Sequence, residues 1–174
     1  MHELPIIEFG NPILRQTARR MSISEIKSDD TKHLIKRMKF TLTNKKRGVG
    51  LAAPQIGKDL ALAVVVIQPT KHRPNVNQLE LVLFNPKIVS ASSRKVQMWE
   101  GCLSCGPSPL FAKTPRYKKI ELEYNDQAGK RCRQTFEDLA AQVIQHEIDH
   151  LNGVLFVDRV TDAKTYMSLK EYKR

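Results

Sequence analysis

The chain has 174 residues, of which 41% are hydrophobic and 6% aromatic, and it carries a formal net charge of +11 at pH 7. This length and apolar content suit one domain with its own core, and no change in composition marks a linker, so we expect a single domain over residues 1–174. The longest apolar run, residues 60–67, is too short for a membrane-spanning helix, and we expect no membrane partner.

The start of the chain and its cysteines favour a reducing compartment. MHELPIIEFGNP has an acid and a proline where a signal peptide has basic residues and a long apolar stretch. We therefore expect a cytoplasmic protein of a bacterium, with an organellar origin left open. Three cysteines are an odd number in a chain that can fold without disulfides, which directs attention to metal or redox chemistry.

Clusters of Lys and Arg recur along the chain, for example at 36–39, 45–47 and 116–119. This excess of positive charge is compatible with a polyanionic partner such as ribosomal RNA. The low aromatic content and the lack of an RNA-binding signature favour a solvated basic surface over a dedicated nucleic-acid site.

The first predicted element is an amphipathic helix over about residues 30–45, where apolar residues recur at helical spacing among basic ones. These apolar residues are Leu34, Ile35, Met38 and Leu42. GVGLAAPQIG, residues 48–57, has the glycines and the proline of a loop. The apolar runs at 60–67 and 79–89 then predict strands joined by a polar connection.

The later part of the chain predicts a hairpin and a long helix. Residues 118–124 and 130–136 have the composition of strands and flank NDQAG, a turn that contains glycine. From Asp138, expected as the N-cap, DLAAQVIQHEIDHL predicts a helix that ends at Asn152 and Gly153. The mixture of short strands and helices places the chain in the α+β class.

The motif QHEIDH, residues 145–150, lies in the apolar part of this helix. His146 and His150 are four residues apart and share a face, so both can donate a nitrogen to one metal ion, with Glu147 beside the open position. Burying two imidazoles without partners would be costly. The alternative is a chance HExxH on a surface helix with solvated histidines, which the apolar flanks disfavour.

Two histidines leave a catalytic metal site one protein ligand short. The residues after His150 contain no histidine and offer three acids, Asp158, Asp162 and Glu171. Upstream, EGCLSC at 100–105 places a thiol between glycines, where it can reach a metal. We therefore predict Cys102 as the third ligand.

The other cysteines allow further interpretations. Cys102 and Cys105 have the spacing of half a zinc ribbon or of a redox pair. A ribbon needs a second pair, which Cys132 alone cannot supply, and a thioredoxin-like motif should open a helix, whereas Gly-Pro-Ser-Pro follows here. We interpret Cys132, on a predicted strand, as structural.

Three segments in this order, GVGLAAPQ (48–55), EGCLS (100–104) and QHEIDH (145–150), resemble the signature motifs of the peptide deformylases, which remove the N-formyl group from nascent polypeptides. The likeness runs from LPIIEFGNPILR to GVLFVDRV, over most of the chain. It implies antiparallel β-sheets around a central metal-bearing helix. A glycine-rich phosphate loop is the rival interpretation of GVG, but the lysine and glycine spacing of that motif are missing.

The resemblance also implies a metal centre and its chemistry. The ligands would be Cys102, His146 and His150, and the ion iron(II), although zinc, nickel or cobalt suit the same donors. Glu147 would be the general acid and base. The substrates would be N-formylated nascent peptides.

The resemblance assigns the substrate contacts to other segments. Gln55 and the backbone N–H of Leu103 would lie at the formyl oxygen, and the backbone of Val49 and Gly50 near the peptide. Val143 is a candidate for the apolar side-chain pocket, although it could equally be core.

The chain also departs from the family pattern. After EGCLS it reads CGPSPLFAKTP, so the rim of the cleft differs. Cys105 adds a second thiol, and one hypothesis is that it makes the enzyme redox-sensitive by pairing with Cys102 when metal is lost. The tail, residues 160–174, has no distinct helical pattern. Two rival functions are a general HExxH peptidase and a catalytically silent, RNA-binding relative of the enzymes.

Overall fold

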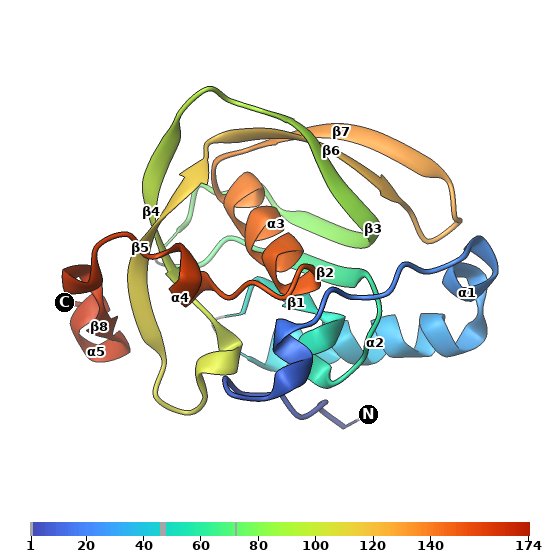
Figure 1. Cartoon of the computed structure of the whole chain (residues 1–174), viewed down its shortest axis with the longest axis horizontal. Helices are drawn as coiled ribbons and strands as arrows, with labels where there is room; N and C mark the ends of the chain where they lie inside the picture. Colours follow the sequence, from blue (N-terminus) through green and yellow to red (C-terminus); the bar gives the residue numbers. More distant parts are fainter. Residues whose placement is uncertain (1, 46–47, 72) are drawn as a thin grey trace.

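Two antiparallel sheets surround helix α3 (Asp138–Leu151) in a computed structural model of the chain, which describes residues 2–45, 48–71 and 73–174 (Figure 1). The larger sheet has the strand order β1-β2-β3-β6-β7, and the smaller has the order β4-β5-β8. The strands are β1 (Gly50–Ala52), β2 (Leu62–Ile67), β3 (Leu79–Ala91), β4 (Lys95–Gly101), β5 (Leu110–Tyr117), β6 (Lys119–Asn125), β7 (Arg131–Glu137) and β8 (Met167–Ser168). The other α-helices are α1 (Ile23–Lys27), α2 (Asp29–Asn44), α4 (Phe156–Arg159) and α5 (Leu169–Tyr172).

Strand β2 is buried on both faces, which explains its unbroken apolar sequence. Its side chains alternate between two clusters, as the period of two residues in a strand requires. Leu62 and Val64 pack with Met38 of α2, while Val65 and Ile67 pack with Ile144 of α3. The two helices therefore cover opposite faces of the larger sheet.

The predicted amphipathic helix is confirmed as α2. Ser28 caps it by accepting a hydrogen bond from the backbone N–H of Thr31, and Asp29 and Asp30 in its first turn favour the positive end of the helix dipole. The predicted strands and hairpin correspond to β2, β3, β6 and β7, and α3 ends near the predicted Asn152.

Two local expectations are wrong. Residues 48–57 are not only loop, because β1 pairs with β2 and a 3-10 turn, Ala53–Ile56, follows it. The N-cap of α3 is Glu137 and not Asp138. The backbone N–H of Asp138 donates to Lys118 O at 2.8 Å, and Asp138 has a φ of 51°, so the chain turns sharply from β7 into the helix without a side-chain cap.

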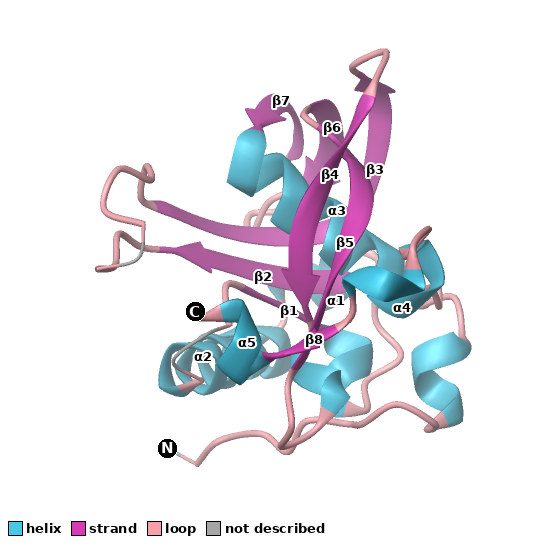
Figure 2. Cartoon of the chain, turned by 90° about the vertical axis from the view of Figure 1, so that its left-hand side faces the viewer, coloured by secondary structure: helices cyan, strands magenta, loops and turns pink. Residues whose placement is uncertain are grey.

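The tail forms β8 and α5, and β8 pairs with the first two residues of β5 (Figure 2). Within the described residues, no helix has both the length and the apolar character that a membrane span requires.

Candidate active site

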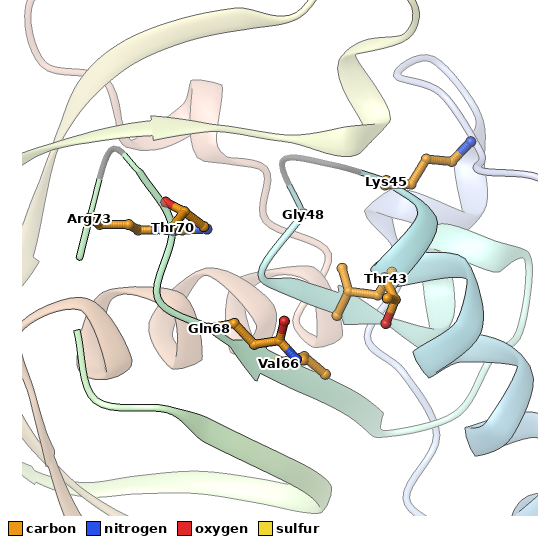
Figure 3. A pocket seen from close by; sticks show the side chains of 8 residues that line it. Thr43, Lys45, Gly48, Val66, Gln68, Thr70 and Arg73 are labelled. Carbon is orange, nitrogen blue, oxygen red and sulfur yellow. The ribbon is translucent and has the colours of Figure 1, made fainter. Parts of the chain in front are cut away.

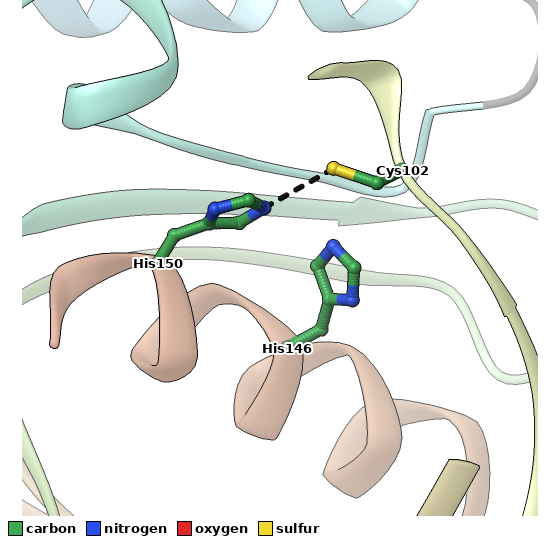
Figure 4. A group of neighbouring side chains, drawn as sticks. All are labelled: Cys102, His146 and His150. Carbon is green, nitrogen blue, oxygen red and sulfur yellow. Dashed lines mark hydrogen bonds between the residues drawn. The ribbon is translucent and has the colours of Figure 1, made fainter. Parts of the chain in front are cut away.

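Three potential metal ligands meet where β4 ends above α3 (Figure 4). Cys102 directly follows β4, and His146 and His150 lie one turn apart on α3. Their ligand atoms all lie within 4.8 Å of one another, and Cys102 Sγ is 3.3 Å from His150 Nε2. His150 is 1% exposed, and the side chain of His146 is 11% exposed.

This cluster fits a metal ion. One thiolate and two imidazoles are a donor set of catalytic zinc and related sites, with a position left for water or substrate. Burial lowers the pKa of His150, which favours the neutral imidazole that a metal requires. Two buried atoms, His150 Nδ1 and Glu147 Oε2, have no hydrogen-bond partner among the described residues.

Glu147 lies against the backbone of β1. A Cβ atom added to Gly50 would come within 2.1 Å of Glu147 Oε1, so glycine leaves the space that this carboxyl group occupies. Burial raises the pKa of Glu147 to about 7. A carboxyl group with such a pKa can both take up and release a proton near neutral pH.

A buried network of charges holds the ring of His146. Glu100 accepts hydrogen bonds from His146 Nδ1 at 3.2 Å and from Arg116 Nε at 2.7 Å. Arg116 also donates to Asp149 at 2.5 Å, and Asp149 accepts from Arg159. Burial raises the pKa of Glu100, but the hydrogen bonds from His146 and Arg116 outweigh it and hold the pKa at about 2.

The sequence motifs alone do not predict this network. Glu100 and Asp149 nevertheless belong to EGCLS and QHEIDH, so two members of the network lie within the motifs. Because partners of this kind orient ligating histidines, Glu100 is placed to direct the other ring nitrogen of His146 toward the other potential metal ligands.

Gln55 reaches the cluster from the 3-10 turn after β1. Its Oε1 accepts from the backbone N–H of Ala52 at 2.8 Å, which orients the amide. Nε2 then donates toward Cys102 Sγ at 3.6 Å and Ser104 Oγ at 3.3 Å. A fixed N–H donor therefore lies beside the potential metal ligands.

A cleft of about 1020 Å³ contains most of the sequence-predicted site. Its lining includes Val49, Gly50, Gln55, Cys102, Leu103, Val143, His146 and Glu147, whereas His150 is not part of the lining and joins the site through its cluster with Cys102 and His146. A recess of about 100 Å³ shares Lys45, Gly48, Thr70 and Arg73 with the cleft (Figure 3). The structure thus brings the predicted residues other than His150 to one cavity.

The family model for polypeptide deformylase matches residues 3–166. The chain belongs to the polypeptide deformylase family. It is 39% identical to peptide deformylase 2 of Nostoc sp., over 98% of this chain and 93% of that protein. Peptide deformylase of Desulfotalea psychrophila is also 39% identical, over 98% of this chain and 95% of its own length.

Solved structures agree with this membership. A class I type b peptide deformylase from Acinetobacter baumannii, bound to Met-Ala-Ser, has a TM-score of 0.85 at 31% identity, covering 91% of this chain and 99% of that one. Peptide deformylase from Thermotoga maritima has a TM-score of 0.78 at 33% identity, with coverages of 93% and 100%. The predicted α+β fold, family and enzyme class, a metal-dependent hydrolase of N-formyl groups, are confirmed.

The remaining cysteines differ in their surroundings. Burial, followed by the neighbouring Cys102, raises the pKa of the Cys105 thiol to about 11. Such a thiol is mostly protonated at neutral pH and reacts slowly, which argues against the hypothesis that Cys105 pairs with Cys102. Cys132 is half-buried on β7 and packs at the edge of the cluster that contains Tyr124.

Proposed function

We propose that this deformylase binds one divalent metal ion through Cys102, His146 and His150, with iron(II) as the native ion. The buried cluster of these three ligand atoms is the observation that carries the proposal. Imidazole and thiolate donors suit iron(II) and also accept zinc, nickel or cobalt. When bound, the ion supplies a Lewis acid that polarises the formyl carbonyl and brings the pKa of water toward neutrality.

Glu147 is the proton carrier in this proposal. Its carboxylate takes a proton from the water that attacks the formyl carbon, and then returns it to the departing amine. Formate and a peptide with a free α-amine result. The raised pKa of Glu147 and its place against Gly50 support this role.

Gln55 and the backbone N–H of Leu103 stabilise the negative charge that builds on the formyl oxygen. Gln55 is suited to this role because Ala52 fixes its amide. One such donor contributes about 3 kcal/mol to transition-state stabilisation.

The substrates are peptides that begin with formylmethionine, held by the backbone of Val49 and Gly50. Val143 both lines the cleft and packs in the core cluster, so it can form the floor of the pocket for the methionine side chain. The Met-Ala-Ser bound by the Acinetobacter baumannii enzyme is the tripeptide that deformylation leaves, which supports this substrate class.

We further propose that residues 1–174 act as one catalytic domain in the bacterial cytoplasm, or in an organelle, close to ribosomes. The charge of +11 supports transient contact with ribosomal RNA through the basic surface. Co-sedimentation with ribosomes should weaken steeply as salt rises. Binding that ignores salt would contradict the RNA contact.

The deciding test of the mechanism measures formate released from formyl-Met-Ala-Ser by protein loaded anaerobically with iron(II). The Glu147→Gln variant keeps the shape of the side chain but cannot carry the proton, so kcat should fall by about 10²–10⁴-fold. Metal content, measured in parallel, should remain at one ion per chain. A variant with full activity would remove Glu147 from the mechanism.

A further inference from the structure

The tail of the chain is fixed against the edge of the smaller sheet. Strand β8 pairs with β5 through Ser168 opposite Leu110 and Met167 opposite Phe111. The backbone N–H of Leu169 donates to Pro109 O at 3.3 Å, and the side chain of Ser168 accepts from the N–H of Glu171 at the start of α5. These contacts hold the turn α5 in one place.

α5 adds an aromatic ring to two that the sheet supplies. Tyr172 stacks on Phe111 of β5 with 4.4 Å between ring centroids and 7° between ring planes. It also meets the ring of Trp99 on β4 edge-on at 5.7 Å. Trp99, Phe111 and Tyr172 are called the aromatic wall below.

The aromatic wall begins next to the metal site. Phe111 lies opposite Gly101, and a Cβ atom on Gly101 would come within 2.8 Å of Phe111 Cε1. Gly101 directly precedes Cys102. The ring of Phe111 therefore covers the backbone that leads into a proposed metal ligand.

The three rings line the same cleft as Glu147 and His146. Tyr172 remains 42% exposed, so part of its ring is available to a ligand. The cleft volume of about 1020 Å³ is at the upper end of the range for drug-sized ligands. It therefore has room for several residues of a peptide as well as the formylated methionine.

We propose that α5 determines specificity, because the aromatic wall contacts the side chain of a peptide residue that follows the formylated methionine. The favoured side chains are apolar or aromatic, since an aromatic ring stacks on another ring and buries apolar surface. The inference rests on the proposed function, in which formylmethionyl peptides occupy the cleft.

The test compares kcat/KM for two series, formyl-Met-X-Ser and formyl-Met-Ser-X, in which X is Phe, Leu, Ala or Ser. The parent enzyme should prefer Phe and Leu to Ser in at least one series, with the preference in KM. Tyr172→Ala should lower the Phe-to-Ser ratio by about threefold to tenfold. This result is expected whether the variant loses only its ring or releases the whole turn, because both take Tyr172 out of the aromatic wall and leave Trp99 and Phe111 without it.

Two further variants separate the ring from its surroundings. Tyr172→Phe retains the stacked ring and should retain the preference. Lys170→Ala changes a residue of the same turn that is absent from the cleft lining, and it should have the parent ratio.

Trp99 is the single tryptophan of the chain, so its fluorescence provides a binding readout. Titrating Met-Phe-Ser into the metal-loaded enzyme should change this fluorescence, and Tyr172→Ala should weaken the apparent affinity. The inference is overturned if the parent enzyme shows no preference for Phe or Leu over Ser, or if Tyr172→Ala has the same Phe-to-Ser ratio as the parent. Formate release by the parent would still support the proposed function in either case. Absence of formate from every peptide with the metal-loaded parent overturns the proposed function as well.

Discussion

Arginines pair with carboxylates in two very different parts of the molecule. In the interior, Arg116 is 3% exposed and joins Glu100 to Asp149. On the surface of the β6–β7 hairpin, Arg131 pairs with Glu123, and Arg133 pairs with Glu121 at 2.7 Å. The bonds are chemically alike, but only the surface groups can replace a lost partner with water.

The interior charges help to position the residues of the site, whereas the surface charges lie away from it. The interior network contacts His146 through Glu100, so a change in the network should change the orientation of this proposed metal ligand. The side chains of Arg131 and Arg133 are 76% and 58% exposed and lie on a hairpin outside the cleft lining. Exposed pairs of this kind contribute little to stability, whereas breaking a buried one leaves a charge without a partner.

The largest effect is expected from Arg116→Met. It leaves Glu100 and Asp149 without their shared cation, which should lower the free energy of unfolding by about 3–5 kcal/mol. Urea denaturation of the metal-free protein measures the change, with Arg133→Met as the matched surface control. Equal losses in the two variants would remove the distinction between the interior and the surface.

A second prediction concerns Glu147, a buried carboxyl group with one oxygen atom that has no hydrogen-bond partner in the part of the chain that the structure describes. Gly50→Ala puts a methyl group into the space of its Oε1, so the carboxyl must move. A displacement of about 1 Å can reduce the rate by about 10²-fold. Steady-state kinetics should show this loss in kcat while metal analysis still finds one ion per chain. Loss of the metal instead would indicate that Gly50 supports the ligands.

Glu100→Gln tests whether the network acts on the metal. The amide keeps the shape of the side chain but weakens the hydrogen bond to His146 Nδ1, and metal affinity should fall by about 10–100-fold. Competition with a chelator measures the affinity for zinc or cobalt. Glu121→Gln on the hairpin is the control, and its affinity should match that of the parent.

The same contrast explains which parts of the fold the sequence predicts. The strand at 60–67 is visible because both of its faces are buried and its run is apolar. β5 gives no such signal, since the residues that it buries alternate as Ala112, Thr114 and Arg116, which are small, polar or charged. A hydrophobic pattern does not predict a strand such as β5, whose buried face carries the ion pairs of Arg116.

The site follows the same logic. The potential ligands stand in motifs, so the sequence indicates them, and the fold brings them into one cluster. The partners of Arg116 lie 16 and 33 positions away, in another strand and in α3, and no spacing rule connects them. The position of the tail is equally hard to predict from the sequence. Tyr172 is positioned by stacking on Phe111, and the tail has no helical pattern of its own.

The smallest effect is expected at Glu25, an exposed acid with good partners. The hydrogen bond from Arg19, followed by those from Ser22, lowers the pKa of Glu25 to about 2. Because the folded pKa is depressed, the stability that Glu25 adds is complete above its unfolded pKa of about 4.3 and is lost as pH falls toward 2. Glu25→Gln keeps the cap geometry but not the charge, so its urea midpoint should fall slightly less than that of the parent between pH 7 and pH 3. Identical falls would show that water and salt already screen this pair, which would place it with Arg131 and Arg133 rather than with Arg116.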